Sequence, residues 1–237
     1  MSEILDMFAC PIDGTKIDAN LTCEKGHRFS YIDGIYDFLG KEVKTHDVLE
    51  KVTPIYENVW APLGFLITAG RTYSSIMEEA GNYVSGKVVL DVGTGTGKLF
   101  DYAGCERCVG LDISTKFLRV MLSKRSKVIA VKGDARKLPF KAEVFDGVAS
   151  LFVLHMLDNP SLAVHEISRV MKREARCVIG ILTSGNFIAS ILGKWWKISL
   201  KHRDFYLSSI KEAGLELEDS KRMGPWLLLK CKKSGHF

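Results

Sequence analysis

From residue 86 onward, short apolar runs alternate with amphipathic stretches. The run at 87–92 is rich in valine and leucine, as a buried parallel strand should be. Comparable runs occur at 108–113, 128–133, 145–150 and 176–183. Apolar residues at helical spacing lie between them, as at 163–171, and again at 205–214. Strands that alternate with helices predict a parallel sheet covered on both faces, and 215–231 predicts a closing antiparallel pair.

Residues 1–42 follow a different pattern. Turn dipeptides occur at Asp13-Gly14, Lys25-Gly26 and Asp33-Gly34, and short apolar or aromatic runs separate them. This spacing predicts small β hairpins. The stretch that follows has helical, connective character, with a helix predicted at about 71–84. The chain therefore divides into a small β domain at 1–42 and an α/β domain at 43–237.

The composition is that of a globular protein, with 46% hydrophobic and 26% charged residues in 237. No run of 18 or more apolar residues predicts a transmembrane helix. The first residues include Glu3 and Asp6 and lack the basic start of a signal peptide. We therefore expect a cytoplasmic protein, in which the six cysteines are thiols or metal ligands rather than disulfides.

The net charge of +5 has a definite location. Residues 190–237 hold ten Lys or Arg and five Asp or Glu, so the rest of the chain is formally neutral. A basic C-terminal part attracts nucleic acid, an anionic membrane or an acidic substrate. A solvated basic surface with no partner is the plainer interpretation.

A glycine-rich segment directly follows the run at 87–92. It reads D-x-G-x-G-x-G from Asp91 to Gly97, and a helix is predicted at 98–103. A strand, a glycine loop and a helix together present backbone N–H groups to a ligand that approaches closely. A P-loop does not fit, because the glycine spacing is one residue short and Leu99 replaces the hydroxyl residue. The dinucleotide fingerprint fails too, because Lys98 stands at its third glycine position.

The segment resembles the first motif of class I S-adenosylmethionine-dependent methyltransferases, of the type 11 or ubiquinone-biosynthesis kind. Three further segments agree in order over about residues 85–185. They are 108–114, in which a strand ends in the acid Asp112 before a helix start, 133–140, which reads Gly-Asp-Ala-Arg-Lys-Leu-Pro-Phe, and 154–157. The resemblance implies a Rossmann-like α/β fold with a mostly parallel seven-stranded sheet. It also implies S-adenosylmethionine as the cofactor.

The resemblance implies a role for each residue of the cofactor site. Asp91 supports the methionine ammonium, Asp112 accepts hydrogen bonds from both ribose hydroxyls, and Asp134 meets the adenine amino group. Tyr56, in the helix before the sheet, also contacts the cofactor. The remaining cofactor-binding residues that we expect are Gly93, Thr94, Gly95, Gly97, Ile113, Ala135, Ser150 and Leu151.

The first domain resembles the zinc ribbons of rRNA guanine methyltransferases and of small methyltransferase activator subunits. Cys10-Pro11, the pair Cys23 and His27, Phe29, and Asp33-Gly34-Ile35 carry the likeness. It implies a metal site of Cys10, Asp13, Cys23 and His27. The family has a cysteine where Asp13 stands, so a metal-free ribbon is the alternative to bound Zn²⁺.

His155 is the candidate general base, and the alternative is that it forms part of the pocket wall. The fourth strand is not followed by Asn/Asp-Pro-Pro-Tyr/Phe, which argues against methylation of an exocyclic base nitrogen. No Pro-Cys pair is present, which disfavours a covalent cysteine mechanism.

The segment 185–203 is first apolar and then aromatic and basic, and we interpret it as a lid insertion. Its part at 187–200 also suits peripheral contact with a membrane. We favour a methyltransferase of a small-molecule or lipid-like acceptor. An RNA methyltransferase that uses the ribbon to bind rRNA or tRNA is the second hypothesis, and an inactive binding or scaffold protein is the third. No obligate protein partner is evident.

Overall fold

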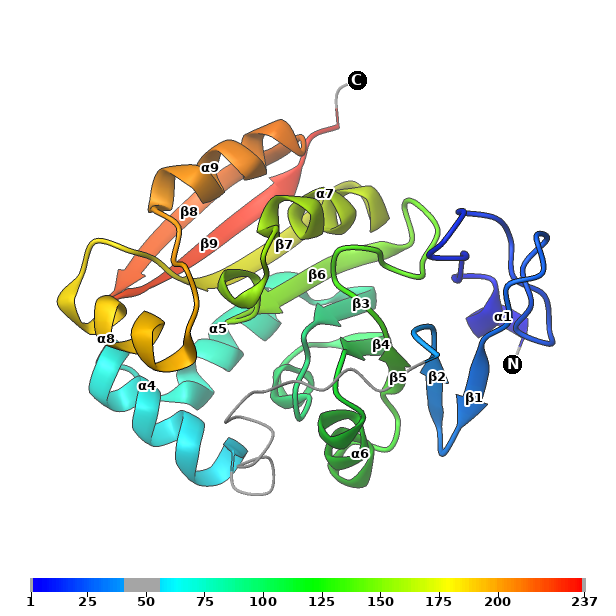
Figure 1. The fold of residues 1–237 in the computed structure, drawn as a ribbon, viewed down its shortest axis with the longest axis horizontal. Helices are drawn as coiled ribbons and strands as arrows, with labels where there is room; N and C mark the ends of the chain where they lie inside the picture. The colour runs from blue at the N-terminus through cyan, green and yellow to red at the C-terminus, as the bar shows by residue number, and fades with distance from the viewer. Residues whose placement is uncertain (1, 41–55, 236–237) are drawn as a thin grey trace.

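One nine-stranded sheet organises the protein in a computed structural model that describes residues 2–40 and 56–235 (Figure 1). The strand order is β1-β2-β5-β4-β3-β6-β7-β9-β8. Neighbours from β2 to β7 pair in parallel, whereas β1–β2, β7–β9 and β9–β8 are antiparallel. The strands are β1 (Ser30–Ile32), β2 (Ile35–Asp37), β3 (Gly86–Val92), β4 (Cys105–Asp112), β5 (Ile129–Lys132), β6 (Phe145–Leu151), β7 (Met171–Leu182), β8 (Leu215–Met223) and β9 (Trp226–Lys233).

Helices cover both faces of this sheet. Leu90 belongs to the same core cluster as the helices α7 and α9, whereas its neighbour Val89 packs in the cluster of α4 and α5. Successive strand residues point to opposite faces, so these two clusters are the two sides of the sheet. The α-helices are α1 (Ser2–Leu5), α4 (Ala61–Ala69), α5 (Tyr73–Val84), α6 (Thr115–Lys124), α7 (Pro160–Val170), α8 (Phe187–Trp196) and α9 (Arg203–Glu212). Short turns of other helix types are η1 (Tyr56–Trp60), η2 (Lys98–Asp101) and η3 (Leu154–Met156).

The sequence predictions for the α/β domain are confirmed in their order. Strands β3 to β9 are the seven expected strands, mostly parallel, with an antiparallel pair at the end. The helix predicted at 98–103 is wrong in extent, since only the short turn η2 forms there. Gly97 precedes η2 with φ 80°, and a Cβ built on it would lie 2.6 Å from Met121. The chain turns tightly against α6 at this point.

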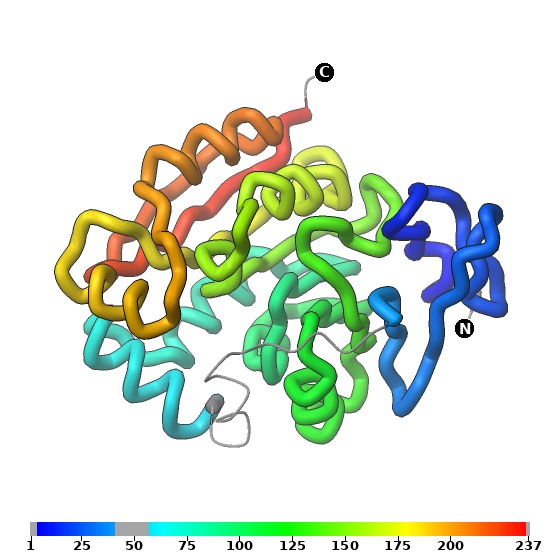
Figure 2. The backbone as a smooth tube through the Cα atoms, in the orientation of Figure 1, coloured from blue at the N-terminus to red at the C-terminus, as the bar shows by residue number. Residues whose placement is uncertain are grey.

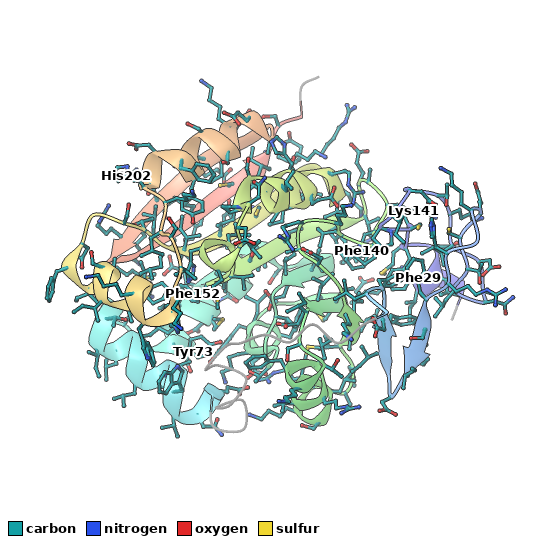
Figure 3. The ribbon with its side chains drawn as sticks, viewed as in Figure 1. Phe29, Tyr73, Phe140, Lys141, Phe152 and His202 are labelled. Carbon is teal, nitrogen blue, oxygen red and sulfur yellow. A yellow bond between two sulfur atoms is a disulfide. The ribbon has the colours of Figure 1, made fainter. Side chains whose placement is uncertain are left out.

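The N-terminal hairpin joins the same sheet. β2 pairs in parallel with β5 in the register Tyr36↔Val131, and the Lys132 Nζ lies 3.1 Å from the Asp37 carboxylate. The ring of Phe8 stacks on Phe140 with centroids 5.6 Å apart. Figure 3 labels Phe140 where the β domain meets the rest of the molecule. The boundary predicted between residues 42 and 43 lies outside the described residues, and the two modules share one core cluster.

The expectation that no cysteine forms a disulfide is wrong. Cys105 and Cys108, at the start of β4, are disulfide-bonded with their Cα atoms 5.5 Å apart. This separation lies within the range that a disulfide spans. The expectation of free thiols rested on the reducing state of the cytoplasm, and that argument takes no account of the distance between two cysteines. Cys10, Cys23, Cys177 and Cys231 are free and buried. Within the described ranges, no helix has the length and hydropathy to cross a membrane.

Candidate cofactor and acceptor site

Three carboxylates lie where neighbouring parallel strands end. Asp91 lies in β3, Asp112 ends β4, and Asp134 follows β5. β4 and β3 are adjacent, and β3 is also paired with β6, so the direction of strand order reverses at β3. Ligands of open α/β sheets bind at such a reversal, beyond the carboxyl ends of the strands.

The glycine loop folds over the end of β4. The N–H groups of Gly93 and Thr94 both donate to the Leu111 carbonyl, at 2.7 and 2.9 Å. The Gly95 N–H donates to Asp112 Oδ2 at 2.9 Å, which ties the loop to the expected ribose carboxylate. Gly93, Gly95 and Gly97 all have positive φ, where glycine avoids steric strain.

The glycines of this loop differ in what surrounds them. A Cβ on Gly93 would lie 2.2 Å from a Val153 methyl group, so this glycine allows the loop to pack against the segment after β6. A Cβ on Gly95 would meet only Phe117, at 3.9 Å. The space beside Gly95 is therefore open, which fits close approach of the cofactor to the backbone there.

Asp112 is held rigidly. Besides the Gly95 contact, its Oδ1 accepts the Ser114 N–H at 2.8 Å, and the side chain is buried. Ile113, between them, is partly exposed. The backbone thus fixes the direction of a carboxylate that the family resemblance assigns to the ribose hydroxyls.

Asp91 is the most electrostatically unusual of the three acids. Burial raises its pKa to about 7, a contact with Thr94 opposes the shift, and the nearby Asp112 adds to it. A buried carboxylate with a raised pKa is stabilised in its ionised form by a cation. This chemistry fits the cofactor's ammonium group, which the resemblance assigns to Asp91.

Asp134 faces a cation of its own chain. Arg136 Nε and Nη2 lie 3.0 and 2.7 Å from the two carboxylate oxygens, and the Arg136 N–H donates at 2.8 Å. Burial alone would raise the pKa of Asp134, but the Arg136 contacts leave it lowered. Ala135, between them, is buried. An adenine amino group would have to share this carboxylate with Arg136.

Ser150 and Leu151 lie at the end of β6, beside the loop. The Ser150 hydroxyl donates to the Val92 carbonyl at 3.2 Å, so it links the ends of two strands. Both residues are buried. Thr94 is buried as well, with its Oγ1 3.8 Å from the Met121 sulfur. These side chains support the backbone of the site.

Arg125, just after α6, joins three parts of the site and was not identified from the sequence. Its Nη1 donates to the Thr96 carbonyl of the glycine loop at 2.8 Å. Its two terminal nitrogens also donate to Glu57 of η1, at 3.1 and 3.0 Å. Nε and Nη2 donate to Asp101 of η2, both at 2.7 Å. All five guanidinium N–H groups are used.

Tyr56 begins η1, and its side chain lies outside the described part of the structure. The next residue, Glu57, is buried and receives Arg125 together with Lys98 and Lys124. Burial alone would raise the pKa of Glu57, but these cations, Arg125 foremost, keep it below the ordinary value. The start of η1 is thereby fixed to the glycine loop.

An aromatic pocket of about 100 Å³ opens beside the segment after β6. All four tryptophans of the chain line it, with two phenylalanines: Trp60, Phe65, Phe152, Trp195, Trp196 and Trp226. Figure 3 shows Phe152 on the side of the molecule where α4 and α8 lie. The same short segment contacts Gly93 through Val153, so one loop forms a wall of the pocket and touches the glycine loop.

Two features of the pocket suit a ligand. Phe152 has φ 65°, a left-handed conformation that costs roughly 1–2 kcal/mol for such a residue and that clusters at functional sites. The Trp196 Nε1 is buried and has no hydrogen-bond partner in the described residues, whereas Trp226 Nε1 donates to Thr68 at 2.8 Å. Trp196 lines the pocket, and its buried donor has a hydrogen-bonding capacity that the described residues do not satisfy.

His155 lies in the wall of this pocket. Its Nδ1 accepts the Leu182 N–H at 3.3 Å, and its ring packs edge-on against Trp226. Burial lowers its pKa to about 3. An imidazole with such a pKa is a weak proton acceptor, because general bases work best near the ambient pH.

The four expected metal ligands meet in the N-terminal domain. One ligand atom from each of Cys10, Asp13, Cys23 and His27 lies within 4.8 Å of all the others. His27 Nδ1 is 2.9 Å from Asp13 Oδ2, 3.2 Å from the Cys23 sulfur and 3.6 Å from the Cys10 sulfur. Bonds of 2.0–2.3 Å to a tetrahedral Zn²⁺ place ligand atoms roughly 3.3–3.8 Å apart. The arrangement therefore fits zinc with little adjustment.

A methyltransferase domain family model matches residues 90–179. Among curated relatives, an uncharacterized protein of Methanocaldococcus jannaschii is 30% identical over 59% of this chain and 66% of its own length. A tRNA (carboxymethyluridine(34)-5-O)-methyltransferase of Arabidopsis thaliana is 31% identical over 50% and 30% of the two chains. A demethylmenaquinone methyltransferase of Renibacterium salmoninarum is 32% identical over 49% and 50%. The chain thus spans less than two thirds of each of these relatives.

Among solved structures, a chain from the complex of the Haloferax volcanii Trm112 methyltransferase activator with a methyltransferase has a TM-score of 0.65. The match covers 80% of this chain and 99% of that one, at 16% identity, and it shows a shared fold. The strand order, the glycine loop and the match over 90–179 identify a class I, S-adenosylmethionine-dependent methyltransferase domain in this chain.

Proposed function

We propose that this protein methylates a small, apolar, ring-containing acceptor with S-adenosylmethionine as the donor. The observation that carries the proposal is the aromatic pocket, which shares the segment after β6 with the glycine loop. Apolar walls with a few polar groups are typical of sites for small organic ligands. Because Val153 contacts Gly93, a ring in the pocket would lie beside the cofactor's binding loop.

The residues of the site act by positioning. Asp91 and Asp112 would hold the methionine part and the ribose of the cofactor, which supplies an electrophilic methyl group for an in-line displacement. The aromatic walls would exclude water and orient the acceptor. We assign His155 to the pocket wall, because its lowered pKa and its bond to the Leu182 N–H make it a poor base.

The acceptor class follows from size and polarity. A pocket of about 100 Å³ is smaller than the ~300–1,000 Å³ of drug-sized sites and suits a single small ring. The Trp196 Nε1 would donate to a hydroxyl or carbonyl oxygen on that ring. A demethylmenaquinone methyltransferase among the relatives supports an acceptor of this kind.

An RNA acceptor is the alternative, favoured by the tRNA methyltransferase among the relatives and by the basic C-terminal part. The two proposals differ in what the pocket does. Trp196→Phe removes the N–H donor and replaces the indole with a smaller aromatic ring. It should raise the KM for a soluble quinol about tenfold and leave cofactor binding unchanged. Methyl transfer to tRNA, with no transfer to quinols or phenols, would overturn the small-acceptor proposal.

Cofactor binding is tested by thermal shift with S-adenosylhomocysteine. The intact protein should be stabilised, and Asp112→Ala should abolish the shift because the ribose contacts are lost. Asp219→Ala, an exposed acid of β8, is the control that keeps the shift. Equal shifts in the two variants would contradict the assignment of Asp112.

We also propose that Cys10, Asp13, Cys23 and His27 hold a structural Zn²⁺. Four protein ligands make a closed site, which stabilises a fold rather than performing chemistry. Metal analysis should find about one zinc per chain in the intact protein and little in Asp13→Ala. Asp18→Ala, an exposed acid of the same domain, is the control. Retention of zinc by Asp13→Ala would remove Asp13 from the ligand set.

A further inference from the structure

We infer that the surface formed by α4 and α8 docks this protein onto an anionic lipid bilayer, beside the aromatic pocket. The inference rests on the proposed function, because it says where an apolar ring acceptor with a lipid tail would be taken up. Figure 2 shows the two helices at one end of the molecule and the N-terminal domain at the other.

The described residues expose thirteen large hydrophobic side chains, and eight of them lie in two short segments. In η1 and α4 these are Val59, Leu63, Leu66 and Ile67, and in α8 they are Phe187, Ile188, Ile191 and Trp195. Ile67 is 71% exposed and Phe187 is 80% exposed. Single exposed apolar residues are ordinary, but a contiguous group marks an interaction surface.

The two segments form one surface. α4 and α8 lie side by side in Figure 1, and the rings of Trp60 and Trp195 are 5.6 Å apart. Both tryptophans also line the aromatic pocket, together with Leu192 of α8. The apolar surface is therefore continuous with the pocket, so a ring could occupy the pocket while its apolar tail stays in the lipid.

Within residues 58–70 and 184–203, the charged side chains are all of one sign. Residues 58–70 hold no charged side chain, and residues 184–203 hold Lys194, Lys197, Lys201 and Arg203 but no acid. Lys194 and Lys197 are exposed at the end of α8. Short helices with an apolar face, interfacial tryptophan and flanking lysines bind anionic membrane surfaces.

A bilayer fits this surface better than RNA does. Single-stranded RNA binds to aromatic platforms in basic grooves, whereas six of the eight exposed side chains here are aliphatic. Aliphatic side chains gain most by entering the acyl region of a membrane.

The test is co-sedimentation of the full-length protein with phospholipid vesicles. The protein should bind phosphatidylcholine vesicles that contain about 30% phosphatidylglycerol, and bind pure phosphatidylcholine at least fivefold more weakly. Leu66→Glu should lower the partition coefficient at least tenfold. Leu162→Glu is the matched control, because Leu162 of α7 is 48% exposed and Leu66 is 53% exposed. The partition coefficient of Leu162→Glu should lie within about twofold of that of the intact protein.

The charge contribution is tested separately. Lys194→Gln and Lys197→Gln should each weaken binding to the anionic vesicles about fivefold and leave binding to neutral vesicles unchanged. Each variant should keep the thermal shift with S-adenosylhomocysteine, which shows that the fold and the cofactor site are intact.

Three outcomes would overturn the inference: no binding to the anionic vesicles, equal binding by Leu66→Glu and the intact protein, or displacement of the protein from vesicles by tRNA at equal salt. Methyl transfer to a soluble quinol is measured without vesicles. If the intact protein transfers no methyl group to the quinol, the proposed function is overturned. If it methylates the quinol but does not bind vesicles, only the docking surface is overturned.

Discussion

Removal of the Arg125 guanidinium is the perturbation whose effect the structure defines most closely. Arg125→Met keeps much of the side-chain volume and removes all five N–H donors. Glu57 then stays buried with only Lys98 and Lys124, at 3.8 and 3.3 Å, to compensate its charge. Breaking a buried ion pair costs about 3–5 kcal/mol, and the two lysines place this case near the lower end.

The expected cost of about 3 kcal/mol corresponds to a fall in Tm of about 6–12 °C for a chain of this length. Unfolding followed by circular dichroism at pH 7.5 measures it. The lowered pKa of Glu57 means that this stabilisation is complete at neutral pH and declines as the pH falls through the lowered pKa. The difference between variant and parent should therefore narrow in acid.

Arg119→Met, within α6, is the control. The Arg119 side chain is 63% exposed against 10% for Arg125, and its ion pair with Asp33 is exposed on both sides. Exposed ion pairs contribute little, so this variant should melt within about 2 °C of the parent. If Arg125→Met and Arg119→Met had the same Tm, the idea that Arg125 locks η1 to the glycine loop would fail.

Three further results are expected. The affinity for S-adenosylhomocysteine should rise by up to tenfold per pH unit as the pH approaches about 7, because Asp91 ionises over this range. In isothermal titration calorimetry, Asp91→Asn should bind weakly and its affinity should not depend on pH in this way. A pH dependence that persists in the variant would contradict the assignment of Asp91 to the ammonium group. Gly93→Ala should lower the Tm more than Gly95→Ala does, because of these two glycines only Gly93 lacks room for a Cβ. Both variants should bind the cofactor more weakly. Equal melting temperatures of the two variants would contradict the packing of Gly93 against Val153. Lys132→Met should destabilise the protein, because it leaves Asp37 without its cation at the β2–β5 junction, and an unchanged urea midpoint would refute this.

The expectation for the cofactor site rests on short-range patterns. The order of Asp91, the glycines and Asp112 is encoded within about twenty residues, and the ends of adjacent parallel strands necessarily meet at one edge of the sheet. The length of the helix after the loop could not be predicted in the same way. Met121 of α6 comes within 2.6 Å of the place of a Cβ on Gly97, and that approach depends on tertiary packing.

The pairing of the N-terminal domain with the sheet was not predictable either. A hairpin sequence predicts its own two strands, but the partner of its outer edge is set by which other edge is available. Here β5 offers that edge, and the Lys132–Asp37 pair fixes the contact.

The sequence alone thus determined the fold class, because strand and helix periodicity are local properties of the chain. The motifs around the glycine loop carried the family resemblance, and that resemblance implied the methyl donor and the carboxylates proposed to hold it. Only the tertiary structure decided the acceptor side. It brings Trp60 together with Trp195, Trp196 and Trp226, which are more than a hundred residues away in sequence. It also decided the chemistry of His155, because burial, which no local pattern encodes, sets the pKa of a side chain.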